Sequence, residues 1–262
     1  MLNIAVRAAR AAGNLLLRYC DRVDSLTVTD KGLNDFVSEV DRAAEQEIIQ
    51  VIRKAYPSHG FLAEESGATR GDEFEWIIDP LDGTTNYLHR FPQFSVSIAL
   101  RRRGLLEQAV VYDPLKEELF TASRGSGAML NDRRIRVTAL KGLKGALLGT
   151  GFPYRDHGQV GAYMDMFRVL MAQSSGIRRA GSAALDLAYV AAGRLDGFWE
   201  IGLAPWDFAA GALLIREAGG LVTDLAGGDN FFETCNLMTG GPKVHAALRE
   251  AIAPHLNDRL RA

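Results

Sequence analysis

The sequence predicts an α/β protein whose two halves are organised differently. From residue 61 to residue 122, short runs of strand-forming residues follow one another with turn residues between them, which indicates an antiparallel sheet. From residue 146 to residue 239, strand-like runs alternate with helical patterns, which indicates an α/β layer. The pattern of predicted elements changes from successive strands to alternating strands and helices near residues 140–146. We therefore expect an N-terminal part, residues 1–145, and a C-terminal part, residues 146–262, packed as one compact unit.

Two helices are expected before the first sheet. Apolar residues recur every three or four positions from Leu2 to Tyr19, as in an amphipathic helix. Residues 32–35 (Gly-Leu-Asn-Asp) predict a turn. A second helix is expected from Ser38, a candidate N-cap, to about Tyr56, because Pro57 cannot continue it.

The remaining elements follow from the same patterns. In the first half, strands are expected at 61–63, 76–79, 94–100, 106–112 and 118–122, with turns at 125–127 and 131–132. In the second half, strands are expected at 146–149, 196–200, 221–224 and 236–239, and helices at 160–171, 181–192, 206–219 and from residue 242 onward. Gly193 and the pair Gly219-Gly220 are expected to end two of these helices.

Composition excludes several classes of protein. The 262 residues are 47% hydrophobic and 24% charged, as in an ordinary soluble domain. Lysine and arginine total 30 and aspartate and glutamate 32, giving a net charge of −2, so the sequence provides no evidence for a broad nucleic-acid surface. The basic runs at 101–103 and 133–134 are typical of solvated faces.

The cysteines and the N-terminus indicate a cytoplasmic protein that does not enter a membrane. Cys20 and Cys235 are far apart in the sequence and are expected to be reduced thiols. No apolar run approaches the roughly 18 residues that a membrane span needs. Arg7, Arg10 and Arg18 interrupt the N-terminal apolar pattern at helical spacing, which argues against a signal peptide.

Residues 76–86 (Trp-Ile-Ile-Asp-Pro-Leu-Asp-Gly-Thr-Thr-Asn) carry the chemistry around which the chain is organised. The apolar start predicts a buried strand that Pro80 ends, and Gly83 allows a close turn before a helix capped by Thr84, Thr85 or Asn86. Two carboxylates, those of Asp79 and Asp82, then lie beside the free N–H groups of a helix start. A divalent cation that holds a phosphate satisfies both groups.

The types of residue restrict the choice of metal. The five histidines show no metal-ligand spacing and the cysteines are unpaired, so a zinc site is not expected. Carboxylates near turns suit Mg²⁺, Mn²⁺ or Ca²⁺, and Mg²⁺ needs few protein ligands because it keeps waters and phosphate oxygens. Asp41 is expected either to cap a helix or, with Lys31, to support a metal site from outside it.

Three motifs occur together in this chain: Ala63-Glu64-Glu65-Ser66, the run from Asp79 to Asn86, and Pro205-Trp206-Asp207-Phe208-Ala209-Ala210-Gly211. In this order and spacing they resemble the inositol monophosphatase family, and the SuhB-type bacterial members most closely. Residues 181–186 and 217–220 also fit, so the resemblance covers essentially the whole chain. It implies a layered α/β sandwich in which helices alternate with two sheets, the phosphatase fold shared with fructose 1,6-bisphosphatase.

The resemblance implies a Mg²⁺-dependent, lithium-sensitive enzyme that hydrolyses myo-inositol 1-phosphate and related phosphomonoesters. A first Mg²⁺ would be held by Glu64, Asp79 and the carbonyl of Leu81, and a second by Asp79, Asp82 and Asp207. A third, weaker ion would lie near Glu64. Most of these ligands are in the N-terminal part.

The resemblance also implies how the other site residues act. Thr84 and Glu64 would orient and deprotonate the attacking water, and Asp82 would belong to the same catalytic centre. Substrate contacts would come from Asp82, Gly83, Thr84, Thr85, Ala183, Glu200 and Asp207. Residues 181–184 do not form the nucleophile elbow of serine hydrolases. They allow two interpretations, contact with a ligand and close helix packing.

Other functions remain open at this point. Related family members act on fructose 1,6-bisphosphate or on 3′-phosphoadenosine-type nucleotides. SuhB-type proteins join the Nus-factor complex with RNA polymerase in transcription antitermination, so protein binding is an alternative role. Family members are usually homodimers, and the resemblance implies the same here.

Overall fold

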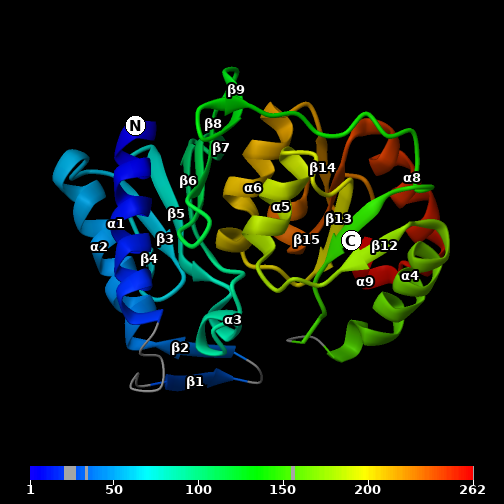
Figure 1. Cartoon of the computed structure of the whole chain (residues 1–262), viewed down its shortest axis with the longest axis horizontal. Coiled ribbons are helices and arrows are strands. Elements are labelled where there is room, and N and C mark those ends of the chain that lie inside the picture. Colours follow the sequence, from blue (N-terminus) through cyan, green and yellow to red (C-terminus); the bar gives the residue numbers. More distant parts are fainter. Residues whose placement is uncertain (21–27, 33–34, 155–156, 262) are drawn as a thin grey trace.

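The computed structural model describes residues 1–20, 28–32, 35–154 and 157–261, with only the backbone described for 28–32 and 35–38. Figure 1 shows alternating layers: a helix pair, a large sheet, a second helix pair, a smaller sheet and a third helix pair. The predicted α/β class with alternating helix and sheet layers is therefore confirmed.

The first layer contains α1 (Leu2–Cys20) and α2 (Glu39–Ala55), which pack on one another and on the large sheet. Four of the six buried residues of α1 are alanine and a fifth is glycine, which lets the two helices approach closely. Between the helices, β1 (Val28–Gly32) pairs antiparallel with β2 (Asp35–Ser38). The sequence predicts a turn at residues 32–35 but neither of these two strands. Residues Leu33 and Asn34 of that turn lie outside the described residues.

The large sheet has the strand order β10-β9-β8-β7-β6-β5-β3-β4. The strands are β3 (Gly60–Ala63), β4 (Gly67–Thr69), β5 (Phe74–Asp82), β6 (Ser95–Arg102), β7 (Leu105–Asp113), β8 (Glu118–Ser123), β9 (Gly127–Leu130) and β10 (Arg133–Arg134). Neighbours are antiparallel except β3 and β5, which are parallel. The short helix α3 (Thr84–Leu88) lies between β5 and β6 in the chain.

The second sheet has the order β12-β11-β13-β15-β14, with β11 parallel to both neighbours and the β13, β15 and β14 pairs antiparallel. Its strands are β11 (Leu147–Thr150), β12 (Gly176–Arg178), β13 (Gly197–Ile201), β14 (Leu221–Thr223) and β15 (Asn236–Gly240). The helices of this half are α4 (Val160–Gln173), α5 (Ala183–Ala191), α6 (Pro205–Glu217), α7 (Phe231–Thr234), α8 (Pro242–Ile252) and α9 (Asp258–Arg261). Single 3₁₀ turns lie at His157–Gln159 and Ala253–His255.

Three apolar clusters hold these layers together. One lies between α1, α2 and the large sheet, one between the two sheets around α5 and α6, and one outside the second sheet under α4 and α8. Helix α6 is buried on every side from Phe208 to Ile215. A Cβ at Gly211 would lie 2.4 Å from Leu187, so glycine permits the close contact with α5.

The end of α6 is fastened to the far edge of the large sheet. Both carboxylate oxygens of Glu217 accept backbone hydrogen bonds, from Gly125 at 2.8 Å and from Gly127 at 2.7 Å. These glycines form the turn between β8 and β9, a turn that the sequence predicts. Glu217 therefore ties the second half of the chain to the first.

Other expectations from composition can be compared with the structure. Within the described residues, no helix is both long and apolar enough to cross a membrane. Neither Cys20 nor Cys235 is part of a disulfide in the described structure. The run Arg101–Arg103 pairs with Glu75 of β5 and with Glu73, the residue before that strand, so its charges are compensated within the protein.

Candidate active site

Asp79 and Asp82 lie at the end of β5, on either side of a bulge. Asp79 is paired with Ser97 of β6 and Asp82 with Ser95, and the register shifts between them. The expectation that Pro80 ends the strand is therefore wrong. Pro80 occupies the irregular segment, where its missing N–H interrupts no regular ladder, and β5 continues to Asp82.

The turn after β5 depends on glycine rather than on a capping side chain. Gly83 is at the N-cap of α3 with φ 97°, and no side chain caps this helix. The expected caps Thr84 and Thr85 are already inside the helix, as is Asn86. A Cβ at Gly83 would lie 2.9 Å from the carbonyl oxygen of Gln93, so only glycine fits.

Asn86 fixes this turn to the second half of the chain. Its side-chain Nδ2 donates to the carbonyl of Gln93 at 2.7 Å and to that of Ala180 at 2.9 Å. A third carbonyl, that of Gly181, lies 3.2 Å away. The loop that precedes α5 is thereby held against α3.

The third carboxylate comes from the first turn of α6. Asp207 accepts a 2.7 Å hydrogen bond from the backbone N–H of Ala204, the N-cap residue, and Pro205 begins the helix. One ligand atom each from Asp79, Asp82 and Asp207 lies within 4.8 Å of the other two. The structure thus brings together three of the predicted metal ligands.

Burial and like charge raise the pKa values of two carboxylates in this cluster. Burial raises the pKa of Asp79 well above its ordinary value, and the charges of Glu64, Asp82 and Asp207 raise it further. Burial also raises the pKa of Asp82 to about 6, although hydrogen bonds from Ser182 and Ala184 oppose the shift. Hard carboxylate oxygens that repel one another in a buried place fit a divalent cation such as Mg²⁺.

Glu64, a fourth predicted ligand, follows β3 directly. Its backbone N–H donates to the carbonyl of Ile78 at 3.1 Å, which places it beside Asp79. Glu45 of α2 holds the same loop: its carboxylate accepts the N–H groups of Glu65 at 2.7 Å and of Ser66 at 2.9 Å. Glu45 is 2% exposed, and the sequence analysis did not identify it.

Thr84 contacts both the ligand loop and α2. Its hydroxyl Oγ1 lies 3.0 Å from Oδ1 of Asp41 and 3.1 Å from the carbonyl oxygen of Leu81. Asp41 is fully buried, and its support of a metal site from outside it stays a prediction. The side chain of Lys31, its expected companion, lies outside the described residues.

Asp82 is also connected to the start of α5. Its Oδ2 accepts hydrogen bonds from the hydroxyl of Ser182 and, at 2.9 Å, from the N–H of Ala184. Helix α5 begins at Ala183 and is packed in the core, as the helix-packing interpretation expects. Gly181, Ser182 and Ala183 also line the pocket beside Asp82, where they can contact a ligand.

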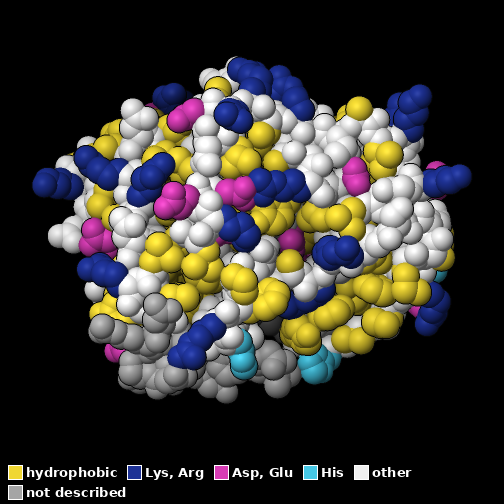
Figure 2. Space-filling view, viewed as in Figure 1, with side chains coloured by type: hydrophobic (Ala, Val, Ile, Leu, Met, Phe, Trp, Pro, Cys, Tyr) yellow, Lys and Arg dark blue, Asp and Glu magenta, His cyan; other side chains and the backbone are white. Residues whose placement is uncertain are grey.

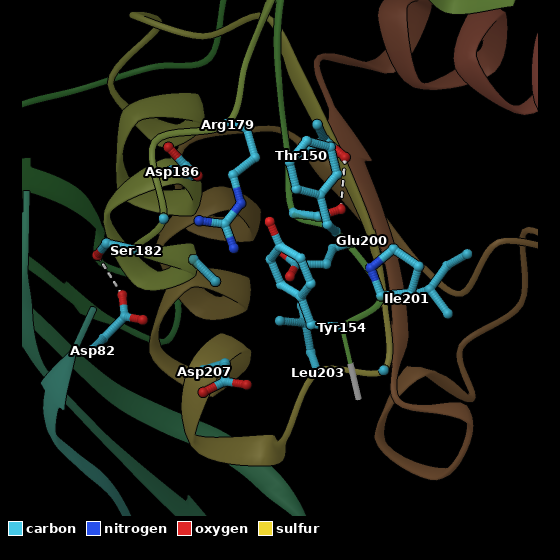
Figure 3. Close-up of a pocket in the computed structure, with 16 residues that line it drawn as sticks. Asp82, Thr150, Tyr154, Arg179, Ser182, Asp186, Glu200, Ile201, Leu203 and Asp207 are labelled. Carbon is cyan, nitrogen blue, oxygen red and sulfur yellow. Dashed lines mark hydrogen bonds between the residues drawn. The ribbon is translucent and has the colours of Figure 1, made fainter. Parts of the chain in front are cut away.

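A pocket of about 180 Å³ extends from Asp82 and Asp207 between α5, β13 and the residues that follow β11 (Figure 3). Ala183 and Glu200, two predicted substrate contacts, line it. Gly83, Thr84 and Thr85 do not line it, and Thr85 is exposed on α3. The pocket thus begins at the acidic cluster and continues into the second half of the chain.

Two charged residues of this pocket were not singled out from the sequence: Asp186 of α5 and Arg179. Burial raises the pKa of Asp186 well above its ordinary value, with a further contribution from Asp82. Burial likewise raises the pKa of Glu200, as do the charges of Asp207 and Asp186. For both Asp186 and Glu45, the sequence feature that could have identified them is an acidic residue on the buried face of a predicted helix.

Comparisons with known proteins agree with the geometry. A model described as "Inositol monophosphatase family" matches residues 1–260. Relatives named Nus factor SuhB from Pseudomonas aeruginosa and Escherichia coli strain K12 are 55% and 52% identical to this chain, and each match covers 100% of it and 98% of the relative.

Two solved structures are similar throughout. Extragenic suppressor protein SuhB from Bartonella henselae superposes with a TM-score of 0.93 at 49% identity, covering 95% of this chain and 97% of that one. The IMPase of Thermotoga maritima superposes with a TM-score of 0.89 at 35% identity, covering 97% of each chain. The fold and the acidic cluster therefore occur in a chain that is similar to these proteins over nearly its whole length.

Proposed function

Because the chain belongs to the inositol monophosphatase family, we propose that it is a Mg²⁺-dependent phosphatase that hydrolyses myo-inositol 1-phosphate and related phosphomonoesters. The observation that carries this proposal is the convergence of Asp79, Asp82 and Asp207 at one end of a pocket. A phosphate ester can enter this pocket with its phosphoryl group toward the carboxylates.

In this proposal the cluster would hold two or three Mg²⁺ ions, with Glu64, Asp79 and the Leu81 carbonyl as one set of ligands and Asp79, Asp82 and Asp207 as another. When bound, the ions supply Lewis acidity, which favours ionisation of water and neutralises charge on the phosphoryl oxygens. The carboxylates of the chain determine where the ions would lie, and therefore which phosphoryl oxygens they would neutralise.

The remaining residues position water and substrate. Thr84, whose hydroxyl lies between Asp41 and the Leu81 carbonyl, orients the attacking water together with Glu64. The first N–H groups of α3, from Gly83 and Thr84, are available to phosphate oxygens because a helix start leaves them without helical partners. Ala183 and Glu200 face the alcohol part of the substrate.

Release of phosphate by Asp82→Asn and Asp207→Asn tests this proposal. Each change removes a carboxylate charge with little change of shape, and we expect Mg²⁺-dependent turnover to fall roughly 100-fold or more. Asp165→Asn, at an exposed ion pair on α4, is the control and should retain full activity. Near-normal Mg²⁺-dependent turnover in either site variant would refute the assignment.

The substrate within the family is decided by a panel of phosphomonoesters, measured with and without Mg²⁺ and Li⁺. Fructose 1,6-bisphosphate and a 3′-phosphoadenosine-type nucleotide are the alternatives to myo-inositol 1-phosphate. Glu200→Gln should change the order of preference among them more than it changes the Mg²⁺ requirement. An equal loss on every substrate would argue against a role of Glu200 in recognition.

A second function is favoured by the names of the relatives. Proteins 52% to 55% identical to this chain are named Nus factor SuhB, so we propose that this chain also acts in the cytoplasm as a component of a Nus-factor complex with RNA polymerase. Complementation of a deletion strain with Asp82→Asn separates the two roles. Full rescue indicates that the binding role is sufficient, whereas no rescue indicates that catalysis is required.

We also infer that the chain forms a homodimer through α4. Val160, Met164 and Met171 are exposed along one side of this helix, and hydrophobic side chains gather over its position at the lower right of Figure 2. Spacings of four and seven positions place these side chains on one face of α4, which can pack against its copy. Met164→Glu should then give a monomer by light scattering, while Gln173→Glu at the helix end should not.

A further inference from the structure

The part of the pocket away from Asp82 and Asp207 contains two charged groups to which the proposed function gives no role, Asp186 and Arg179, beside Glu200. Figure 3 shows Asp186, Arg179 and Glu200 around this part, with the guanidinium group of Arg179 extending between Asp186 and Tyr154. All of them line the pocket. Arg179 is the one lysine or arginine among the lining residues that the structure describes.

The carboxylates in this part of the pocket lack partners within the described chain. Asp186 is 2% exposed, yet no described residue donates a hydrogen bond or an ion pair to its carboxylate. The same holds for the carboxylate of Glu200, which reaches over Gly151. Because both side chains line the pocket, their carboxylates can accept hydrogen bonds from a ligand there, and they favour one that donates.

Arg179 is held by aromatic rings rather than by these acids. Its guanidinium carbon lies 5.4 Å from the ring centre of Phe152 and 5.3 Å from that of Tyr154, and the two rings meet edge to face. No carboxylate oxygen of the described residues lies within 4.0 Å of its nitrogens. The guanidinium group is therefore fixed with donors facing the pocket, separated from Asp186 and Glu200.

The ligand chemistry follows from this separation. A phosphate or carboxylate placed there would accept from Arg179 but be repelled by both acids, and an ammonium group would meet the reverse conflict. A hydroxyl group can donate to a carboxylate and accept from a guanidinium group at once. Neighbouring hydroxyls on one ring satisfy all three side chains.

We propose that Arg179 and Asp186, together with Glu200, select substrates that carry several hydroxyl groups on the carbon skeleton beyond the phosphate ester. Phe152 and Tyr154 hold Arg179 in place for this contact. The inference rests on the proposed phosphatase function and adds to it the residues that distinguish a cyclic polyol phosphate from a simple alkyl phosphate.

Paired kinetics on myo-inositol 1-phosphate and ethyl phosphate test the selection, since only the first has hydroxyls to lose. Arg179→Gln and Asp186→Ala should each lower kcat/KM for the inositol ester roughly 10- to 100-fold, mainly through KM, as expected for a lost hydrogen bond to a charged group. Ethyl phosphate should change by less than about 3-fold under the same reasoning.

Two further variants serve as controls. Arg178→Gln changes the neighbouring exposed arginine, whose Nη1 donates to the carbonyl of Ile177 at 3.1 Å and which does not line the pocket. It should leave both substrates unaffected. Asp186→Asn keeps the shape of the buried side chain, so it tests the carboxylate where Asp186→Ala fails to fold.

An equal loss on both substrates would overturn the proposal, because it would indicate a general effect on the fold or on the charge of the pocket. A loss confined to fructose 1,6-bisphosphate would also overturn it, in favour of recognition of a second anion. If the wild-type chain hydrolyses no phosphomonoester, the phosphatase proposal fails separately. Equilibrium binding of the same two esters then tests selection, and a preference for the inositol ester that persists in Arg179→Gln refutes it.

Discussion

Glu45 shows how single buried acids of α2 determine the geometry of the site. It does not contact the cluster of Asp79, Asp82 and Asp207 itself, but its two oxygens hold the backbone of Glu65 and Ser66, next to the ligand Glu64. Asp41, one helical turn earlier, accepts a hydrogen bond from the side-chain hydroxyl of Thr84. Helix α2 therefore supports two separate segments of the site from one face.

Glu45→Gln should weaken Mg²⁺ binding. Glutamine offers one acceptor where glutamate offers two, so one of the two N–H groups loses its partner and the loop is no longer fixed. We expect a loss of about 1–3 kcal/mol in unfolding free energy and a higher Mg²⁺ concentration for half-maximal activity. Denaturant titration and a Mg²⁺ titration of phosphate release measure the two effects.

The matched control for this change is Glu47→Gln, on the same helix but only partly buried. It makes the same chemical change without a backbone contact to lose. If both variants required the same Mg²⁺ concentration, the role given to Glu45 would be incorrect.

At this scale, the sequence identifies residues in local motifs better than residues on helix faces. Asp79 and Asp82 stand beside a proline and a glycine, which mark a turn. Glu45, Asp186 and Arg179 belong to helices or loops whose partners are distant in the chain, and the sequence does not show which acid of a helix is buried. The roles of Glu64, Thr84 and Glu200 stay predictions until the variants are measured.

Among the elements, the turn between β5 and α3 is the most constrained. Its backbone must have positive φ at Gly83 and must pass close to the carbonyl of Gln93. The sequence predicts a turn here from Gly83. It does not predict the bulge at Pro80, because a bulge depends on the register with β6, which is a property of two strands.

Gly83→Ala should destabilise the protein by more than an ordinary substitution of a left-handed glycine. The left-handed conformation alone costs about 1–2 kcal/mol for a residue with a Cβ. Gly104→Ala, at φ 81° in the β6–β7 turn with open space around it, measures that cost by itself. Urea unfolding of both variants isolates the additional cost of the contact with Gln93, and equal losses would show that the close approach is unimportant.

Short elements account for most of the differences between expected and observed structure. Strands β4, β9, β10 and β12 have two to four residues, too few to show an alternating pattern, and they pair at sheet edges. The long helices and the central strands have clear periodicity and were predicted to within a few residues. The parallel pairing of β3 with β5 was not predicted, since strand order is a tertiary property.

For the whole molecule, the acidic site makes stability depend on pH and on metal in opposite ways. Without metal, the folded chain binds protons more tightly than the unfolded chain, because the pKa of Asp82 rises from 3.8 to about 6 and that of Asp79 also rises. Its stability therefore falls as pH increases from about 4 through about 6. Bound Mg²⁺ needs the ionised carboxylates, so its stabilisation increases over the same range.

The increase of Tm caused by Mg²⁺ should accordingly be small at about pH 5 and larger at about pH 7.5. Thermal melts at both pH values, with K⁺ at matched ionic strength as the control, measure this difference. In Asp207→Asn the increase at the higher pH should be reduced. An Mg²⁺ effect that is independent of pH would mean that the ions bind elsewhere.

The division of the chain into an N-terminal and a C-terminal part near residues 140–146 is still a proposal. The two sheets belong to different halves, but one apolar cluster contains residues from both. We therefore propose that the halves unfold together rather than as separate domains. A single transition in calorimetry would agree with this proposal.

Helix α6 is attached to the large sheet at its two ends by unlike means. Glu217 binds the β8–β9 turn through permanent hydrogen bonds, whereas Asp207 meets Asp79 and Asp82 as mutually repelling charges. The first turn of α6 is also held by one hydrogen bond, from the Ser97 hydroxyl of β6 to the Trp206 carbonyl at 3.2 Å. Without a cation, we therefore expect the N-terminal end of α6 to be held less firmly than its C-terminal end. Chelation should speed amide hydrogen exchange in the first turn of α6 and leave its last turn protected, so that metal occupancy controls how firmly the two sheets are joined.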